Sequence, residues 1–187
     1  MGMPAASTNW TAERVRALPD DGKRYEVIDG ELYVTPAPSW EHQRAAFGLA
    51  YRIRSYLANQ MVAEVYVAPA DIEFRFDRMV EPDLFVVPMV DGRRPRRWEE
   101  VRRLLLAVEI LSPSSARSDH LAKRLLYQRE QVPEYWIVDV DARLIERWRP
   151  NDTRPEIIVG TVDWVPAPEF PTLTIDLDAY FQEVCIE

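Results

Sequence analysis

Two stretches of the sequence decide the fold: VEPDLFVV (residues 80–87) and LLLAVEIL (residues 104–111). The first predicts a strand, and the second is a continuous apolar run interrupted by a single charge, which indicates a strand covered on both faces of a sheet. Asp83 begins the first strand behind Pro82, and Glu109 lies near the end of the second, 26 positions later. If the two strands are neighbours, the two carboxylates can converge.

Such a pair of acids needs a partner, because burying a carboxylate is costly unless it is paired, protonated or coordinated. Two converging acids indicate a hard divalent cation, Mg²⁺ or Mn²⁺. The only cysteine, Cys185, offers no thiolate cluster, so oxygen or imidazole ligands are expected. The alternative is that Glu109 pairs with an arginine and that Asp83 is a turn residue after proline.

The elements around these runs predict an α/β (α+β) fold with a central mixed sheet flanked by helices. Thr11 caps a short helix, Asp29-Gly30 joins two strands of an N-terminal hairpin, and Ser39 caps a long helix over about residues 40–59. Residues 61–76 predict a strand pair or one bent strand. With 187 residues and 47% hydrophobic content, we expect a single domain over 1–187, with a core at about 11–148 and a β-rich extension at 149–187.

A basic group is also expected near the two acids. Side chains alternate along a strand, so position 111 would face the same site as Glu109, but it holds a leucine. A helix follows directly, with a predicted apolar stripe of Leu121, Ala122, Leu125 and Leu126. Lys123 lies at the edge of this stripe and is the candidate to orient water or to stabilise charge on a phosphate; the alternative is a solvated helix-edge lysine.

Composition limits the other function classes. The net charge of −8 argues against general affinity for nucleic acid, although residues 92–103 contain six arginines. This segment is either a local basic patch, with Arg93, Arg94, Arg96 and Arg97 as candidate nucleic-acid contacts, or a solvated surface connection. No apolar run approaches the roughly 18 residues of a membrane span and no signal-peptide layout is present, so we expect a cytoplasmic protein without a membrane partner.

Five segments in order carry a resemblance to a known family: RYEVIDGELYV, PAPSWEHQ, VEPDLFVV, LLLAVEILSPSS and RSDHLAKRLLYQREQVPEYWIVDV. Together they resemble the Uma-type family of restriction-endonuclease-like proteins, within the PD-(D/E)XK nuclease superfamily. The similarity extends from about residue 11 to residue 148. The combination is specific, whereas the dipeptide Pro82-Asp83 alone would mean little.

The resemblance implies a four-stranded mixed core sheet, a Mg²⁺ or Mn²⁺ cofactor and a DNA substrate. It implies that Asp83 and Glu109 are the acids of the superfamily motif and that Lys123 replaces the strand lysine lost at Leu111. Superfamily members often add an acid from the first core helix, for which Glu41 fits best here.

Other polar residues are harder to place. By periodicity His42 points to the core, as a packed or hydrogen-bonded histidine rather than a ligand. Glu26 and Glu31 lie in the matching hairpin without an assigned place, and His120 could reach the site but receives no role.

The expected activity is metal-dependent hydrolysis of nucleic-acid phosphodiester bonds. One rival is an inactive nuclease-fold protein that serves as a binding or interaction module, and another is a glycosidase with two carboxylates. A homodimer is also expected. Trp148 and Trp164, taken as exposed in the tail, could cover a sheet edge, form the dimer surface, or pack on their own domain.

Overall fold

The computed structural model describes residues 9–97, 100–101 and 103–185. The helices are α1 (Ala12–Arg16), α2 (Trp40–Leu57), the π-helix η2 (Ser118–Lys123), α3 (Arg124–Arg129) and α4 (Leu177–Val184). The strands are β1 (Arg24–Ile28), β2 (Glu31–Thr35), β3 (Ala63–Val67), β4 (Ile72–Arg75), β5 (Arg78–Val80), β6 (Leu84–Pro88), β7 (Leu106–Ile110), β8 (Tyr135–Asp139), β9 (Leu144–Trp148), β10 (Glu156–Ile158), β11 (Thr161–Trp164) and β12 (Leu173–Asp176). Within the described ranges, no helix has the length and apolar character needed to cross a membrane.

The predicted local signals are confirmed. Asp29 and Gly30 both have positive φ, 53° and 79°, and form the two-residue turn between β1 and β2. The Thr11 side chain accepts a hydrogen bond from the backbone N–H of Arg14 at the start of α1. The Ser39 side chain accepts one from the backbone N–H of His42 and caps α2.

The central sheet has six strands in the order β10-β9-β8-β7-β6-β3, so it is larger than the expected four-stranded core. It is a mixed sheet, because β7 and β8 are parallel while the other neighbours are antiparallel. A four-stranded antiparallel sheet, β2-β1-β5-β4, contains the N-terminal hairpin, and β11 pairs with β12. The stretch 61–76 divides between two sheets, since β3 joins the central sheet and β4 the N-terminal one.

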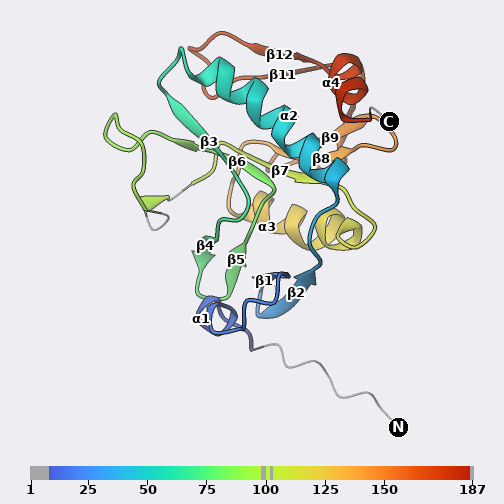
Figure 1. Ribbon diagram of the computed structural model, residues 1–187. Helices are drawn as coiled ribbons and strands as arrows, with labels where there is room; N and C mark the ends of the chain where they lie inside the picture. Colours follow the sequence, from blue (N-terminus) through green and yellow to red (C-terminus); the bar gives the residue numbers. More distant parts are fainter. Residues whose placement is uncertain (1–8, 98–99, 102, 186–187) are drawn as a thin grey trace.

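The elements form layers around the central sheet (Figure 1). Helices α2 and α4 and the β11–β12 hairpin cover one face, and η2, α3 and the N-terminal sheet lie on the other. Side chains alternate between these faces: Leu84 and Val108 pack in the core under α2, whereas Phe85 and Ala107 pack toward α3. Odd-numbered residues of β6 and β7 therefore face α3.

The predicted stripe of the η2–α3 helix is wrong in part. Leu121 and Leu125 are 51% and 48% exposed, while Leu126 is buried as predicted. The buried face carries Asp119 and Lys123 instead. The physical reason is charge. This face lies over buried carboxylates, and a lysine there compensates their negative charge, which a leucine could not do.

The expectation of exposed tail tryptophans is also wrong. Trp148 and Trp164 are 8% and 2% exposed, and both pack on their own chain. The guanidinium carbon of Arg124 lies 4.8 Å from the Trp148 ring centre, and Trp164 meets Tyr56 edge to face at 6.2 Å. These rings are therefore not the surface of a dimer, and the homodimer itself stays a prediction.

Candidate active site

The register of β6 and β7 brings Asp83 and Glu109 together. Leu84 is the partner of Val108 in this antiparallel pair, so Asp83, one step before, falls opposite Glu109, one step after. Both acids have the odd-numbered parity of the α3 face and are 3% and 1% exposed. The backbone N–H of Ile110 donates to Asp83 Oδ2 at 2.8 Å, which ties the two strand ends together.

Asp83 is fixed by two basic side chains from different elements. Arg24, the first residue of β1, donates from Nη1 to Oδ1 at 2.7 Å, and His42, in the first turn of α2, lies with Nε2 3.0 Å from Oδ2. Burial would raise the pKa of Asp83, but the hydrogen bond from His42 and the charge of Arg24 outweigh it and lower the pKa to about 2. Asp83 is therefore ionised at neutral pH.

Lys123 is the centre of a second cluster. Its Nζ lies 2.9 Å from Glu26 Oε2, 3.0 Å from Glu109 Oε1 and 3.6 Å from Asp119 Oδ1. Burial alone would lower the pKa of Lys123, but the charges of Glu109, Glu26 and Asp119 raise it well above its usual value. The lysine is therefore a buried ammonium that joins β1, β7 and η2.

Glu109 stands between the two clusters. Its Oε1 accepts a hydrogen bond from Tyr127 at 3.2 Å and forms the ion pair with Lys123. Burial raises the pKa of Glu109 well above its usual value, and the neighbouring charge of Asp83 raises it further, although Lys123 opposes both. Burial likewise raises the pKa of Asp119. Acidic groups thus outweigh basic ones at this site.

The charge inventory tests whether a divalent cation fits. Four carboxyl groups, those of Glu26, Asp83, Glu109 and Asp119, are buried beside two permanently charged partners, Arg24 and Lys123. Acidic groups therefore outnumber the permanently charged bases around this site, and a divalent cation would compensate that excess.

Acceptor positions are available for such an ion. Asp83 uses three of the roughly four lone-pair positions of a carboxylate, and both contacts of Glu109 use Oε1. The described residues contain no group of three or more acids, histidines or cysteines arranged to hold an ion. A cation here would thus rely on Asp83, Glu109 and water, as Mg²⁺ commonly does.

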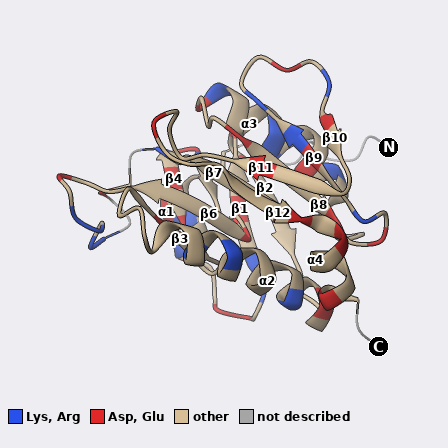
Figure 2. Cartoon of the chain, turned by 90° about the horizontal axis from the view of Figure 1, so that it is seen from above, with Lys and Arg blue, Asp and Glu red and all other residues tan. Residues whose placement is uncertain are grey.

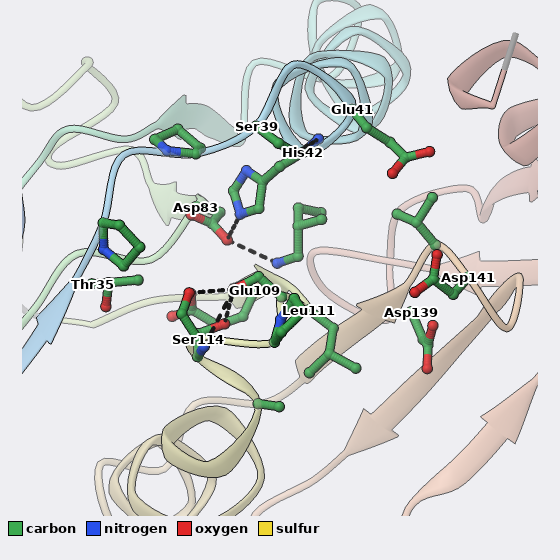
Figure 3. A pocket seen from close by; sticks show the side chains of 18 of the residues that line it. Thr35, Ser39, Glu41, His42, Asp83, Glu109, Leu111, Ser114, Asp139 and Asp141 are labelled. Atoms are coloured by element: carbon green, nitrogen blue, oxygen red, sulfur yellow. Dashed lines mark hydrogen bonds and ion pairs between the residues drawn. The ribbon is translucent and has the colours of Figure 1, made fainter. Parts of the chain in front are cut away.

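The site opens into a cavity of about 470 Å³. Its lining includes Asp83, Glu109, Lys123 and Arg24, and three loops close around them: residues 35–39 before α2, 111–116 after β7, and 139–142 after β8. This volume is in the range of pockets that bind small molecules. Figure 3 shows Asp83 and His42 in contact at its base, with Glu109 beside them.

Some predicted residues lie at the edge of this site. Glu41 lines the cavity but is exposed, and it stands apart from Asp83 and Glu109, as do Asp139 and Asp141 (Figure 3). Leu111 lines the cavity too, on the side predicted from strand alternation. Glu41 is thus a rim residue here, and its catalytic role stays a prediction.

Other candidates lie elsewhere. His120 contacts Glu146, with Nε2 3.2 Å from Oε1, and does not line the cavity. The arginine-rich segment follows the far end of β6, five residues of strand away from Asp83. There Arg93 pairs with Glu100 and Arg94 with Glu64. The candidate contacts Arg93, Arg94, Arg96 and Arg97 do not line the cavity, and Arg102 lies outside the described residues.

Sequence reasoning did not place Arg24, Glu26 and Asp119 at the site. A usable signal existed for Glu26, since Val27 and Ile28 are adjacent apolar residues of one strand and predict that both of its faces are covered. For Asp119 the signal was its spacing of four residues from Lys123 on one helix. Arg24 offered none, because a strand-end arginine is ordinarily solvated.

Comparison with known proteins agrees with this architecture, which is that of a restriction-endonuclease-like protein. The family model described as "Uma2: Putative restriction endonuclease" matches residues 12–178, and the chain belongs to this family. A crystal structure described as "a putative nuclease belonging to DUF820 from Anabaena variabilis ATCC 29413" has the same fold, with a TM-score of 0.68 over 94% of this chain and 99% of that chain at 21% identity. No protein of the curated set matches the sequence.

Proposed function

We propose that this protein is a metal-dependent endonuclease that hydrolyses phosphodiester bonds of DNA. One observation carries the proposal: Asp83 and Glu109 meet in register on one face of the sheet, and Lys123 reaches Glu109 at the base of the same cavity. We assign Mg²⁺ or Mn²⁺ to Asp83 and to Oε2 of Glu109. When bound, the ion supplies a water of lowered pKa and neutralises charge on the phosphate.

The residues of the chain supply the rest of the chemistry. Arg24 and His42 hold the Asp83 carboxylate ionised and in one orientation. Lys123 keeps its proton and offers a positive charge where negative charge develops on the phosphoryl oxygens. The water oxygen forms a bond to phosphorus as the bond to the leaving oxygen breaks, and a proton of that water ends on the leaving oxygen, which yields a phosphate monoester and an alcohol without a covalent intermediate.

The second candidate is an inactive nuclease-fold protein that acts as a binding or interaction module. Leu111 stands where the superfamily has its lysine, and both Asp83 oxygens already accept hydrogen bonds. Metal binding distinguishes the two candidates, because only the enzyme needs an oxygen of Asp83 to bind a metal ion in addition to, or in place of, one of its present hydrogen bonds.

The experiment is cleavage of supercoiled plasmid and of labelled single-stranded DNA with Mg²⁺, Mn²⁺ or EDTA. We expect cleavage by the wild type with metal and a loss of at least 100-fold in Asp83→Asn and Glu109→Gln. Asp178→Asn, which changes an exposed carboxylate on α4 outside the cavity lining, is the control and should retain activity. Equal cleavage by wild type and both site variants would indicate a contaminating nuclease, and wild-type DNA binding without cleavage would favour the binding module.

A further inference from the structure

The outer face of α2 carries an exposed aromatic stripe that neither the core nor the candidate site uses. Trp40, Phe47 and Tyr51 are 88%, 73% and 65% exposed. At 100° per residue their side chains leave the helix within about 40° of one another. Large exposed aromatic groups aligned in this way mark an interaction surface.

Arginines interleave with these rings. Arg44 and Arg54 fall on the same side of α2, so the five positions share a sector of about 80° and extend over about 21 Å of helix. Arg44 is exposed, and the Arg54 side chain is 46% exposed, with Nη1 3.6 Å from Glu64 Oε2. Figure 2 shows the basic bands along α2, beside an α4 marked by acids. The stripe is therefore aromatic and locally basic in an acidic protein.

The stripe also begins at the candidate active site. Ser39, Glu41 and His42, which flank Trp40, line the cavity, although His42 leaves the helix about 160° from Trp40 to contact Asp83. A chain lying along the outer face of α2 would therefore pass around the start of that helix to enter the cavity. This continuity distinguishes the stripe from a patch remote from the chemistry.

We infer that the α2 stripe, formed by Trp40, Arg44, Phe47, Tyr51 and Arg54, binds single-stranded nucleic acid and leads it to the cavity. Unpaired bases stack on aromatic side chains while arginines meet the phosphates. In a duplex the faces of the bases are covered by their neighbours, so it could not use the rings in this way. The inference rests on the proposed function and adds the form of its substrate: a single strand or an unpaired end.

The acidic rim of the cavity favours the same substrate form. Glu41, Asp139 and Asp141 line the opening, and a duplex would bring two strands of phosphates close to them. A single strand brings fewer phosphates to these acids. The surface thus favours unpaired over paired DNA on grounds of charge as well as stacking.

The test measures binding apart from cleavage. Fluorescence anisotropy of a labelled 20-nucleotide oligo(dT), and of its duplex with oligo(dA), is recorded in EDTA for the full chain. We expect the wild type to prefer the single strand and the triple variant Trp40→Ala/Phe47→Ala/Tyr51→Ala to bind it at least tenfold more weakly. The matched control is Ile157→Ala/Val159→Ala, which removes exposed apolar groups elsewhere and should bind like the wild type.

Two further measurements make the result decisive. In Arg44→Ala/Arg54→Ala the slope of log K for oligo(dT) binding against log salt concentration should become less steep by about 1.4. This corresponds to about 0.7 for each of two lost phosphate contacts. Unchanged oligo(dT) binding by the triple variant would overturn the inference. So would a change from dimer to monomer in that variant, measured by light scattering, with binding per protomer preserved, since the stripe would then join two copies. Failure of the proposed function looks different, because the wild type would then bind oligo(dT) but not cleave it with metal.

Discussion

The ammonium group of Lys123 lies 3.0 Å from Oε1 of Glu109, and both side chains are almost completely buried. This contact joins the helix after β7 to the centre of the strand pair. It places a positive charge beside the two strand acids although position 111 holds a leucine. The lysine also stabilises the fold, because removing one partner of a buried ion pair leaves the charge of the other uncompensated.

Replacing Lys123 should destabilise the fold strongly. In Lys123→Met the carboxyl groups of Glu26 and Glu109 lose their nearest cation, and we expect a loss of about 3–5 kcal/mol in the free energy of unfolding. Urea denaturation followed by circular dichroism measures this loss. Lys23 is the other lysine of the chain and pairs with Asp21 at the surface, so Lys23→Met provides a control that should leave the stability close to that of the wild type.

A double variant separates charge from packing. If the loss in Lys123→Met comes from uncompensated charge, Lys123→Met/Glu109→Gln should recover part of it, because the second substitution removes one of the buried acids. Additive losses in the double variant would show that the methionine simply packs poorly.

Stability should fall as the pH rises through the titration of Glu81. Burial raises the pKa of Glu81 to about 7, although the charge of Arg24 opposes the shift. Between pH 4.5 and 7 the folded state therefore binds more protons than the unfolded state, and the free energy of unfolding decreases with pH. The contribution of this group is on the order of 3 kcal/mol.

Glu81→Gln isolates that contribution. The glutamine is neutral at every pH, so we expect the variant to gain stability relative to the wild type at pH 8 and to lose this advantage at pH 4.5. Denaturant unfolding at pH 4.5, 6, 7 and 8 gives the comparison. A constant difference between variant and wild type across this range would show that Glu81 does not titrate as described.

The sequence predicts the fold and the strand acids well, because both follow from local patterns. The segments around Asp83 and Glu109 predict buried strands, and a carboxylate such as Glu109 inside an apolar run requires a partner that compensates its burial. By contrast, Leu121 and Leu125 are apolar yet exposed, because periodicity records which face of a helix is apolar and not which buried charges it must meet. That information lies in the tertiary arrangement.

The partners of the acids were the least predictable part of the site. Arg24 and Glu26 come from a hairpin that belongs to another sheet, and no local spacing connects them with β7. Only the packing of the N-terminal sheet against η2 and α3 brings Glu26 to Lys123. Long-range ion pairs of this kind depend on how the sheets pack against each other, and no local pattern in a single sequence predicts that packing.

Glu26 should matter for activity although it is not assigned to the metal. It holds Lys123 at 2.9 Å and accepts the backbone N–H of Glu81 at 2.8 Å, just before Asp83. In Glu26→Gln the lysine loses one anchor, and we expect nuclease activity to fall at least tenfold. Glu31→Gln, in the same hairpin but exposed, is the control and should keep activity. Equal activity in both variants would exclude a positioning role for Glu26.

Divalent metal should stabilise the protein through Asp83 and Glu109. A ligand present at 100 times its dissociation constant adds about 2.7 kcal/mol, which corresponds to roughly 5–10 °C in Tm for a chain of this size. We expect Mg²⁺ or Mn²⁺ to raise the Tm of the wild type by this amount, and to leave Asp83→Asn and Glu109→Gln unchanged. Glu41→Gln tests whether Glu41 is a metal ligand. If metal raises the Tm of this variant as much as that of the wild type, Glu41 is not a ligand, and a smaller rise shows that it is one. No metal response in the wild type would contradict the assignment of the two strand acids.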